Sequence, residues 1–236
     1  MKIDSRESFD KYAAEYDSAL SQGLSVSGET KDYFARRRIE WLRDQLQKDM
    51  AHADHVMDYG CGTGSSAPLL SEILGAKSLV GTDKSVESLQ IATHNFGSKT
   101  VTFFRFDEYQ PDGTFDLVYC NGVFHHIALS ERAAAVNYIF QSLRPGGYFA
   151  FWENNPWNPG TRLVMSRIPF DHDAITITAR GAQALLRSGG FELLRTDFLF
   201  IFPNILNSLR WIEPFCTSFP LGAQYLVLCR KSFDSR

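Results

Sequence analysis

A glycine-rich loop follows an acidic residue in the stretch HVMDYGCGTGSS. Gly60, Gly62 and Gly64 permit a tight turn and a close approach of the backbone to a ligand. The dinucleotide pattern G-x-G-x-x-G/A requires glycine or alanine at the position where Ser65 stands. The carboxylate of Asp58, just before the turn, disfavours a phosphate and suits a cation. The loop therefore indicates a ligand with a cationic group rather than a pyrophosphate.

Three further polar residues follow predicted strands. Asp83 ends SLVGTD and is positioned to accept hydrogen bonds from two ribose hydroxyls, a feature that dinucleotide sites share. Asp107 follows VTFFRF and is positioned to accept an adenine amino group, and Asn121 follows the next strand. We expect these groups to line one edge of a sheet, where ligands of open α/β folds bind.

Two adjacent histidines, His125 and His126, come after the fourth predicted strand. Histidine titrates near neutral pH and is the commonest general base. Glu153, which ends the fifth predicted strand, would lie beside this loop and could orient one imidazole. We predict all three as catalytic residues, with His125 slightly preferred as the base. The alternative is that one histidine points elsewhere and the other forms a structural hydrogen bond.

Several other polar groups have two interpretations. The amides of ENNPWNPG could hold a polar substrate group or could form turns. One residue of the run Arg36–Arg38 could reach a ligand carboxylate, although such runs are usually solvated. Asp171–His172–Asp173 resembles a metal cluster, but further ligands are missing nearby, so we expect no metal site.

Short apolar runs alternate with helical patterns and would position these groups. The predicted strands are HVMDYG, SLVGTD, VTFFRF, FDLVYC, GYFAFWEN, FELLRTDFLFIF and AQYLVLC. The predicted helices span Ser65–Gly75, Ser85–Phe96, Ser130–Leu143 and Thr178–Ser188, with the first three opened by serine. This order favours an α/β fold, a doubly wound and mostly parallel sheet with helices on both faces.

At this point the sequence resembles the class I S-adenosylmethionine-dependent methyltransferase family. The resemblance covers about residues 50–155 and is carried by VMDYGCGTG, VGTDKS, the acid in RFDEYQPDGTFDLVYCNGVFHHI, and LRPGGYFAFWEN. It implies a seven-stranded sheet whose last strand is antiparallel, and S-adenosyl-L-methionine as cofactor. The implied cofactor-binding residues are Tyr16, Asp58, Gly60, Cys61, Gly62, Gly64, Asp83, Lys84, Asp107 and Asn121.

The resemblance also suggests how the chain is divided. Residues 1–50 are expected to form an N-terminal helical lid, because Phe9 to Asp17 is similar to the lid helix of small-molecule members. Residues 51–236 would form the Rossmann-like domain, with cover insertions at about 156–177 and 203–221. The aromatic residues between Trp211 and Phe219 could line a pocket or a dimer face.

Composition limits the alternatives. The chain has 236 residues, of which 44% are hydrophobic and 22% charged, values typical of a folded domain. A net charge of −3 and the absence of a basic patch disfavour nucleic acid as a partner. We expect no secretory signal, no membrane span, four reduced cysteines without a CxxC pair, and a cytoplasmic location.

The sequence thus predicts a methyltransferase that acts on a small, partly apolar acceptor, as a monomer or a homodimer. Two other functions stay open. One is a module that binds S-adenosylmethionine without transferring the methyl group, and the other is an NAD-dependent oxidoreductase.

Overall fold

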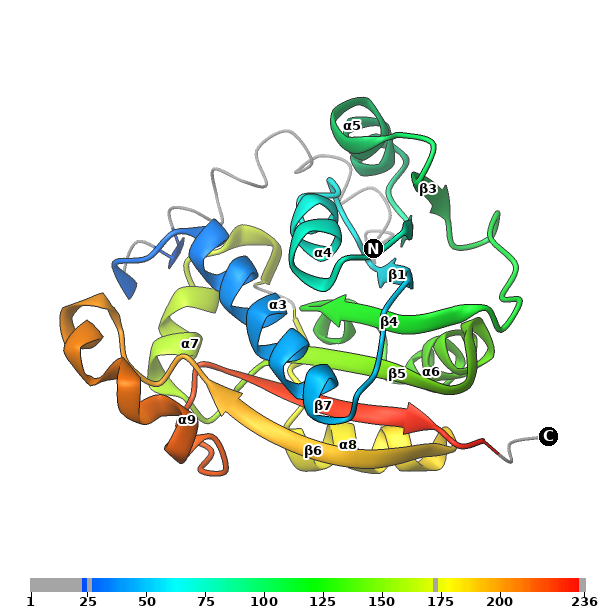
Figure 1. The fold of residues 1–236 in the computed structure, drawn as a ribbon. Coiled ribbons are helices and arrows are strands. Elements are labelled where there is room, and N and C mark those ends of the chain that lie inside the picture. The colour runs from blue at the N-terminus through cyan, green and yellow to red at the C-terminus, as the bar shows by residue number, and fades with distance from the viewer. Residues whose placement is uncertain (1–22, 25–26, 172–173, 234–236) are drawn as a thin grey trace.

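A computed structural model describes residues 23–24, 27–171 and 174–233, and its centre is a seven-stranded sheet (Figure 1). The strand order is β3-β2-β1-β4-β5-β7-β6. The strands are β1 (His55–Tyr59), β2 (Ser78–Asp83), β3 (Val101–Arg105), β4 (Phe115–Asn121), β5 (Leu143–Asn154), β6 (Phe191–Leu199) and β7 (Gln224–Lys231).

Strands β1 to β5 pair in parallel, whereas β7 is antiparallel to both β5 and β6. The predicted fold class is confirmed, including the antiparallel last strand. Strands β2 and β3 lie on one side of β1, and β4 lies on the other side. The strand order therefore reverses between β1 and β4. The carboxyl ends of strands at such a reversal form the crevice in which open α/β sheets bind ligands.

Helices cover both faces of the sheet, as predicted (Figure 1). Helices α3 and α4 lie on one face and α6 and α8 on the other, while α5 packs on β2 and β3. The helices are α3 (Lys31–Lys48), α4 (Ala67–Leu74), α5 (Val86–Phe96), α6 (Arg132–Ser142), α7 (Pro159–Met165), α8 (Ala179–Ser188) and α9 (Glu213–Cys216). Short 3-10 turns are η2 (Phe124–His126), η3 (Pro169–Asp171) and η4 (Asn204–Ile212).

Strand β4 shows why the sheet is buried on both faces. Leu117 and Tyr119 pack against the core under α3 and α4, whereas Val118 and Cys120 pack against the core over α6 and α8. All four side chains are at most 1% exposed. A strand buried on both faces is expected to be apolar at nearly every position, as FDLVYC is.

The predicted helix starts are only partly right. Ser85 caps α5 by accepting a hydrogen bond from the Ser88 amide, and Thr178 caps α8 in the same way. The helices expected at Ser65 and Ser130 begin two residues later, without a side-chain cap hydrogen bond. Residues 1–22 and 25–26 lie outside the described part of the chain, and with them the segment Phe9 to Asp17 on which the predicted lid rests.

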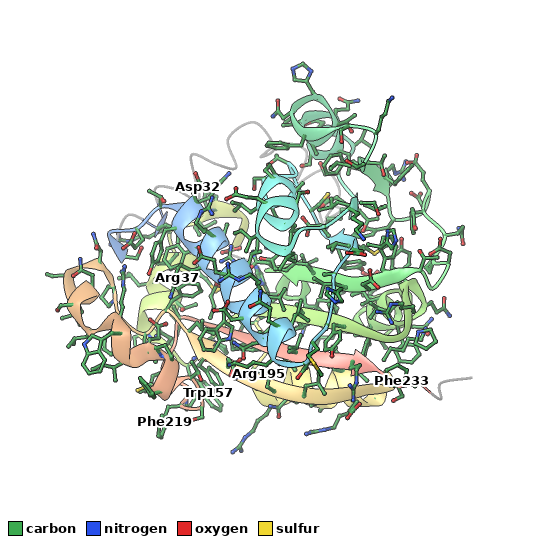
Figure 2. All side chains as sticks on the ribbon, viewed as in Figure 1. Asp32, Arg37, Trp157, Arg195, Phe219 and Phe233 are labelled. Atoms are coloured by element: carbon green, nitrogen blue, oxygen red, sulfur yellow. The ribbon has the colours of Figure 1, made fainter. Side chains whose placement is uncertain are left out.

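The two predicted cover insertions contain helices α7 and α9 and the turns η3 and η4. Trp211 and Phe215 are exposed on the second of them. Phe219 on the second and Trp157 on the first are exposed as well (Figure 2). None of these four side chains is among those that border the cavity described below, so the pocket and dimer-face interpretations of the segment between Trp211 and Phe219 stay predictions. Among the described helices, none combines the length and the apolar character that a membrane crossing requires.

Candidate active site

The glycine loop joins β1 to α4 and is bonded to the neighbouring strand. The Gly60 and Cys61 amides both donate to the Thr82 carbonyl, at 2.7 and 3.0 Å. Gly60, Gly62 and Gly64 all have positive φ, between 52° and 75°. A Cβ at Gly60 would meet Val123 at 2.3 Å, but a Cβ at Gly62 would meet nothing within 4 Å. The loop therefore packs tightly at its ends and leaves open space at its centre.

Asp58 and Asp83 are the two carboxylates beside this loop. Asp58 is 3% exposed, and its Oδ2 has no hydrogen-bond partner among the described residues. Burial, reinforced by the charge of Asp83, raises the pKa of Asp58 to about 7. A buried carboxylate in this condition is stabilised by a cation.

Asp83 is already engaged with the backbone around it. Its Oδ2 accepts from the Gly62 amide and its Oδ1 from the Ser85 amide, each at 2.9 Å. Burial raises the pKa of Asp83, and the bonds to backbone amides act in the opposite direction. Asp83 thus holds the loop against the start of α5, a role that the sequence alone did not reveal.

Asn121 ends β4 next to this loop, and its side chain is incompletely bonded. The Asn121 Oδ1 is buried without a partner among the described residues, like the Asp58 Oδ2 and the Thr82 Oγ1. A buried polar atom without a partner is costly, so such atoms call for a ligand or an ordered water. Three of them at the carboxyl ends of β1, β2 and β4 mark the strand reversal as a polar binding site.

The other predicted cofactor residues have different surroundings. Cys61 is buried within the loop, and burial raises the pKa of its thiol. Lys84 directly follows β2. Asp107 is exposed and forms an ion pair with Arg105 at 2.8 Å. Tyr16 lies outside the described residues.

The three predicted catalytic residues lie close together, next to the ends of β4 and β5. They are His125, His126 and Glu153. His125 Nδ1 and Glu153 Oε2 are 2.7 Å apart, so the predicted contact between them is present. Glu153 Oε1 accepts from the amides of Phe124 and His125, and Oε2 also accepts from the Asn154 amide. The carboxylate therefore fixes both the histidine ring and the backbone of its loop.

Asp171, at the end of η3, completes this group. Its Oδ1 lies 3.5 Å from His125 Nε2 and 3.4 Å from His126 Nε2. The two imidazole rings lie side by side, with centroids 4.1 Å apart. The expectation that one histidine points elsewhere is wrong, since both rings face the same carboxylate. The signal was present in the Asp171–His172–Asp173 pattern, which the sequence analysis set aside for lack of nearby ligands.

The charges in this cluster shift the pKa values of its members. Burial opposes protonation of His125, but the charges of Glu153 and Asp171 outweigh it and raise its pKa to about 10. Burial lowers the pKa of His126. Burial also opposes ionisation of Glu153 and Asp171, but the neighbouring imidazoles keep both pKa values below the usual range.

A cavity of about 360 Å³ opens beside the cluster. Its polar floor includes Asn121, His125, His126 and Asp171. Its walls come from α3, from α7, from the segment that follows β6 and from the segment that precedes β7. These walls are largely apolar. The apolar wall residues are Leu24, Phe34, Val164, Met165, Ile168, Phe200, Ile201, Phe202, Pro203 and Ala223. A cavity of this size and composition is typical of a site for a small organic molecule.

Arg38 of α3 also lines the cavity and is 8% exposed. Its Nε donates to the Tyr119 hydroxyl at 3.3 Å and its Nη1 to the Gln224 Oε1 at 2.8 Å. No carboxylate of the described residues pairs with it. Arg36 and Arg37, by contrast, form ion pairs with Glu72 and Glu40. Of the three arginines, Arg38 is therefore the one that presents a buried, uncompensated positive charge to a ligand.

The amides of ENNPWNPG mainly build the cavity wall. Asn155 Nδ2 donates to the carbonyls of Pro220 and Gly222, and Asn158 Oδ1 caps α7 at Thr161. This favours the turn-forming interpretation for Asn155 and Asn158. Asn154 accepts a hydrogen bond from Gln224 and borders the cavity, so a substrate-binding role stays a prediction for it.

Comparisons with known proteins point to one family. Residues 57–151 match a family model described as "Methyltransferase domain". The trans-aconitate 2-methyltransferase of Delftia acidovorans is 28% identical over 139 residues, which are 57% of this chain and 51% of that protein. The ribosomal protein L11 methyltransferase of Pseudomonas fluorescens SBW25 is 30% identical over 112 residues, 48% of this chain and 36% of that protein.

The chain thus spans about half or less of the length of these two curated relatives. A solved S-adenosylmethionine-dependent methyltransferase from Thermotoga maritima, described as a possible histamine N-methyltransferase, has the same fold with a TM-score of 0.65. It is 17% identical, and the match covers 97% of this chain and 100% of that one.

Proposed function

The chain belongs to the class I S-adenosylmethionine-dependent methyltransferase family, and from this premise we propose that it transfers the methyl group of S-adenosyl-L-methionine to a small molecule held in the cavity. The observation that carries the proposal is a pair of acceptors without a partner among the described residues, Asp58 Oδ2 and Asn121 Oδ1, beside the open centre of the glycine loop at Gly62. A ligand that donates hydrogen bonds and carries a positive charge would complete them.

The residues present fit this cofactor. Its ammonium group would compensate the buried Asp58 carboxylate, whose pKa is otherwise raised. Its ribose hydroxyls suit Asp83, and its carboxylate suits the uncompensated guanidinium of Arg38. We keep Gly60, Cys61, Gly62, Gly64, Lys84, Asp107 and Tyr16 as predicted contacts.

NAD fits less well. A pyrophosphate near the glycine loop would face the Asp58 carboxylate, and like charges in a buried site repel strongly. Repulsion of the phosphates disfavours the oxidoreductase alternative. A purely cofactor-binding module is disfavoured by the cavity, because its polar floor contains groups that handle protons.

When bound, the cofactor supplies a methyl group already activated by a sulfonium, so the protein's task is to align and activate the acceptor. The cavity walls exclude water from the acceptor. We propose that His125, His126 and Glu153 orient and activate its nucleophilic atom at the floor, with Glu153 acting through His125. Within residues 1–50, which the sequence predicts as a lid, α3 packs on the sheet and contributes to the cavity wall, and a covering role for the segment before it stays a prediction.

The cavity favours a small acceptor with both apolar and polar parts. Its volume of about 360 Å³ is within the range for small-ligand sites and is too small for a folded protein segment of any length. Protein substrates stay a second candidate, because one relative acts on a ribosomal protein by its name.

Calorimetric titration with S-adenosylmethionine, S-adenosylhomocysteine and NAD tests the cofactor. We expect saturable binding of the first two and no binding of NAD. Arg38→Gln should weaken binding of the first two about 10–100-fold, because a charge-assisted hydrogen bond contributes about 1.5–3 kcal/mol. The matched variant Arg37→Gln, on the exposed side of the same helix, should leave binding unchanged (Figure 2). Binding of NAD alone would contradict the proposal.

The acceptor class is tested separately with methyl-labelled cofactor and a cell extract. After the reaction, the extract is split by ultrafiltration into small molecules and macromolecules. We expect the label in the small-molecule fraction. Label only in the protein fraction would favour a protein substrate, and cofactor binding without any transfer would favour the binding module.

A further inference from the structure

The chain contains a constellation of metal-ligand type that the sequence analysis did not expect. From the geometry of His125, His126 and Asp171 we infer a binding site for a divalent transition-metal ion of the zinc, cobalt or iron type, at the floor of the cavity. One ligand atom from each residue lies within 4.8 Å of the others. Two imidazoles and one carboxylate are a donor set that suits these ions.

The two distances from Asp171 to the histidines agree with this assignment. Asp171 Oδ1 lies 3.5 and 3.4 Å from the Nε2 atoms of His125 and His126. A charge-assisted N–H···O contact is shorter, at about 2.7–2.9 Å. In a tetrahedral site with metal–ligand bonds of about 2.1 Å, neighbouring ligand atoms lie about 3.4 Å apart. The carboxylate is therefore separated from both nitrogens by the edge length of a coordination tetrahedron.

The surroundings of His125 supply the orientation that a ligating histidine needs. Its Nδ1 lies 2.7 Å from Glu153 Oε2, so Nδ1 can donate in this contact, and an ion that binds at Nε2 would displace the proton from that nitrogen. Metal-ligating histidines almost always make such a second bond to a carboxylate or carbonyl, which fixes the tautomer and raises ligand basicity. Glu153 is in turn held by three backbone amides.

The ligands are also held in place by the backbone. The Ile175 amide donates to the His125 carbonyl at 2.8 Å, which ties the chain after η3 to the histidine loop. The Asp171 amide donates to the Ile168 carbonyl at 3.1 Å. Segments distant in the sequence are thus fixed against each other at the point where their ligand atoms meet.

The charge balance favours a cation as well. Asp171 is a buried carboxylate whose Oδ1 lies 3.5 and 3.4 Å from two imidazole nitrogens, and buried charges are normally paired or bound to metals. A divalent ion would neutralise this carboxylate where it meets the imidazoles.

All three ligand residues border the cavity, so an ion there would be accessible to a small molecule. Three protein ligands with one position left for water or substrate are the pattern of catalytic rather than structural zinc sites. The atom that would occupy this open position is an oxygen or nitrogen atom of the methyl acceptor. This role in activation rests on the proposed function, whereas the metal site itself does not.

The test is a Co²⁺ titration of the metal-free full chain, followed by visible absorption, with Zn²⁺ as competitor. We expect a cobalt spectrum that saturates at one equivalent and is abolished by Zn²⁺ but not by Mg²⁺, which prefers oxygen ligands. No methyl donor or acceptor is present, so the result is independent of transfer activity. The absence of saturable binding would overturn the inference and leave the imidazoles as candidate bases.

Variants show whether the ions bind at the cluster. Asp171→Asn and His126→Gln should each weaken Co²⁺ binding by at least about 100-fold, since loss of an outer-shell partner alone costs 10–100-fold. His94→Gln, at an exposed position on α5, is the matched control and should bind like the unaltered chain. Circular dichroism establishes that each variant is folded. Unchanged binding in both folded cluster variants, or an equal loss in the control, would overturn the inference.

Discussion

Two buried carboxylates stand at the carboxyl ends of parallel strands, yet their surroundings are opposite. Asp58 on β1 is near another carboxylate and has an oxygen without a partner among the described residues, and burial raises its pKa. Glu153 on β5 is surrounded by backbone amides and an imidazole, and its pKa is lowered. The first carboxylate depends on a ligand for its compensation, whereas the second is compensated by the chain itself. Asp58 should therefore matter for ligand binding, and Glu153 for the stability of the site.

The largest expected effect is on stability, in Glu153→Gln. Removing one charge of a buried pair typically costs about 3–5 kcal/mol, because the other is left uncompensated. The unfolding free energy from urea denaturation should fall by about this amount. The control is Glu192→Gln, which breaks the exposed pair with Arg230 and should cost less than about 1 kcal/mol. Equal losses of unfolding free energy in both variants would contradict the prediction, because the buried and compensated carboxylate would then contribute no more to stability than the solvated one.

Asp58→Asn should affect cofactor binding rather than stability, which is the reverse of what we expect for Glu153→Gln. We expect its affinity for S-adenosylmethionine to fall about 10–100-fold, since a hydrogen bond to a charged group contributes about 1.5–3 kcal/mol. Its unfolding free energy should stay the same or rise, because the buried charge has been removed. Calorimetry and thermal melting measure the two effects, with the exposed Asp32→Asn as control (Figure 2). A strongly destabilised Asp58→Asn would mean that this carboxylate is structural after all.

The same carboxylate predicts a pH dependence. Its pKa is raised from 3.8 to about 7, so between these values the folded state binds more protons than the unfolded state. This group's contribution therefore lowers stability as the pH rises through that window, and cofactor affinity should increase over the same range as the carboxylate ionises. Below pH 7 the affinity should change by up to about tenfold per pH unit. Asp58→Asn should remove the dependence, and a profile that persists in this variant would assign it to other groups.

The smallest expected effect is that of Gly62→Ala. The added methyl meets no atom within 4 Å, so only the left-handed backbone at φ 52° opposes it, at a cost of about 1 kcal/mol. Cofactor affinity should fall more than stability does, because the methyl would stand in the open centre of the loop. Thermal melting and calorimetry on the same preparation compare the two. An unchanged affinity would place the ligand elsewhere.

The features that the sequence predicted well are local ones. Asp58 and Asn121 lie at the ends of β1 and β4, the glycine loop follows β1 directly, and the carboxyl ends of parallel strands gather at one edge of a sheet. Which of three arginines turns inward depends on the phase of α3, whose buried residues Ile39 and Leu42 place Arg38 beside the core. That phase is set by the apolar residues of the helix and not by the arginine run itself.

The features that the sequence missed depend on tertiary contacts. Asp171 meets His125 and His126 only because η3 folds back on the loop after β4. Asp83 was predicted as a ribose acceptor, and its bonds to the Gly62 and Ser85 amides became visible only with the loop in place. The spacing of residues along the chain contains little information about contacts between side chains that are distant in the sequence.

The position of β7 sets an order of events during synthesis. β7 lies between β5 and β6, so β6 has no neighbour in the sheet until residues 224–231 have been made. Gln224 and Ala223, at its start, also border the cavity. At about 5–20 residues per second, the nascent chain would spend several seconds with an unpaired edge on β5. The growing chain would then be most open to chaperones during this interval, and it could bind an acceptor only after translation has passed β7.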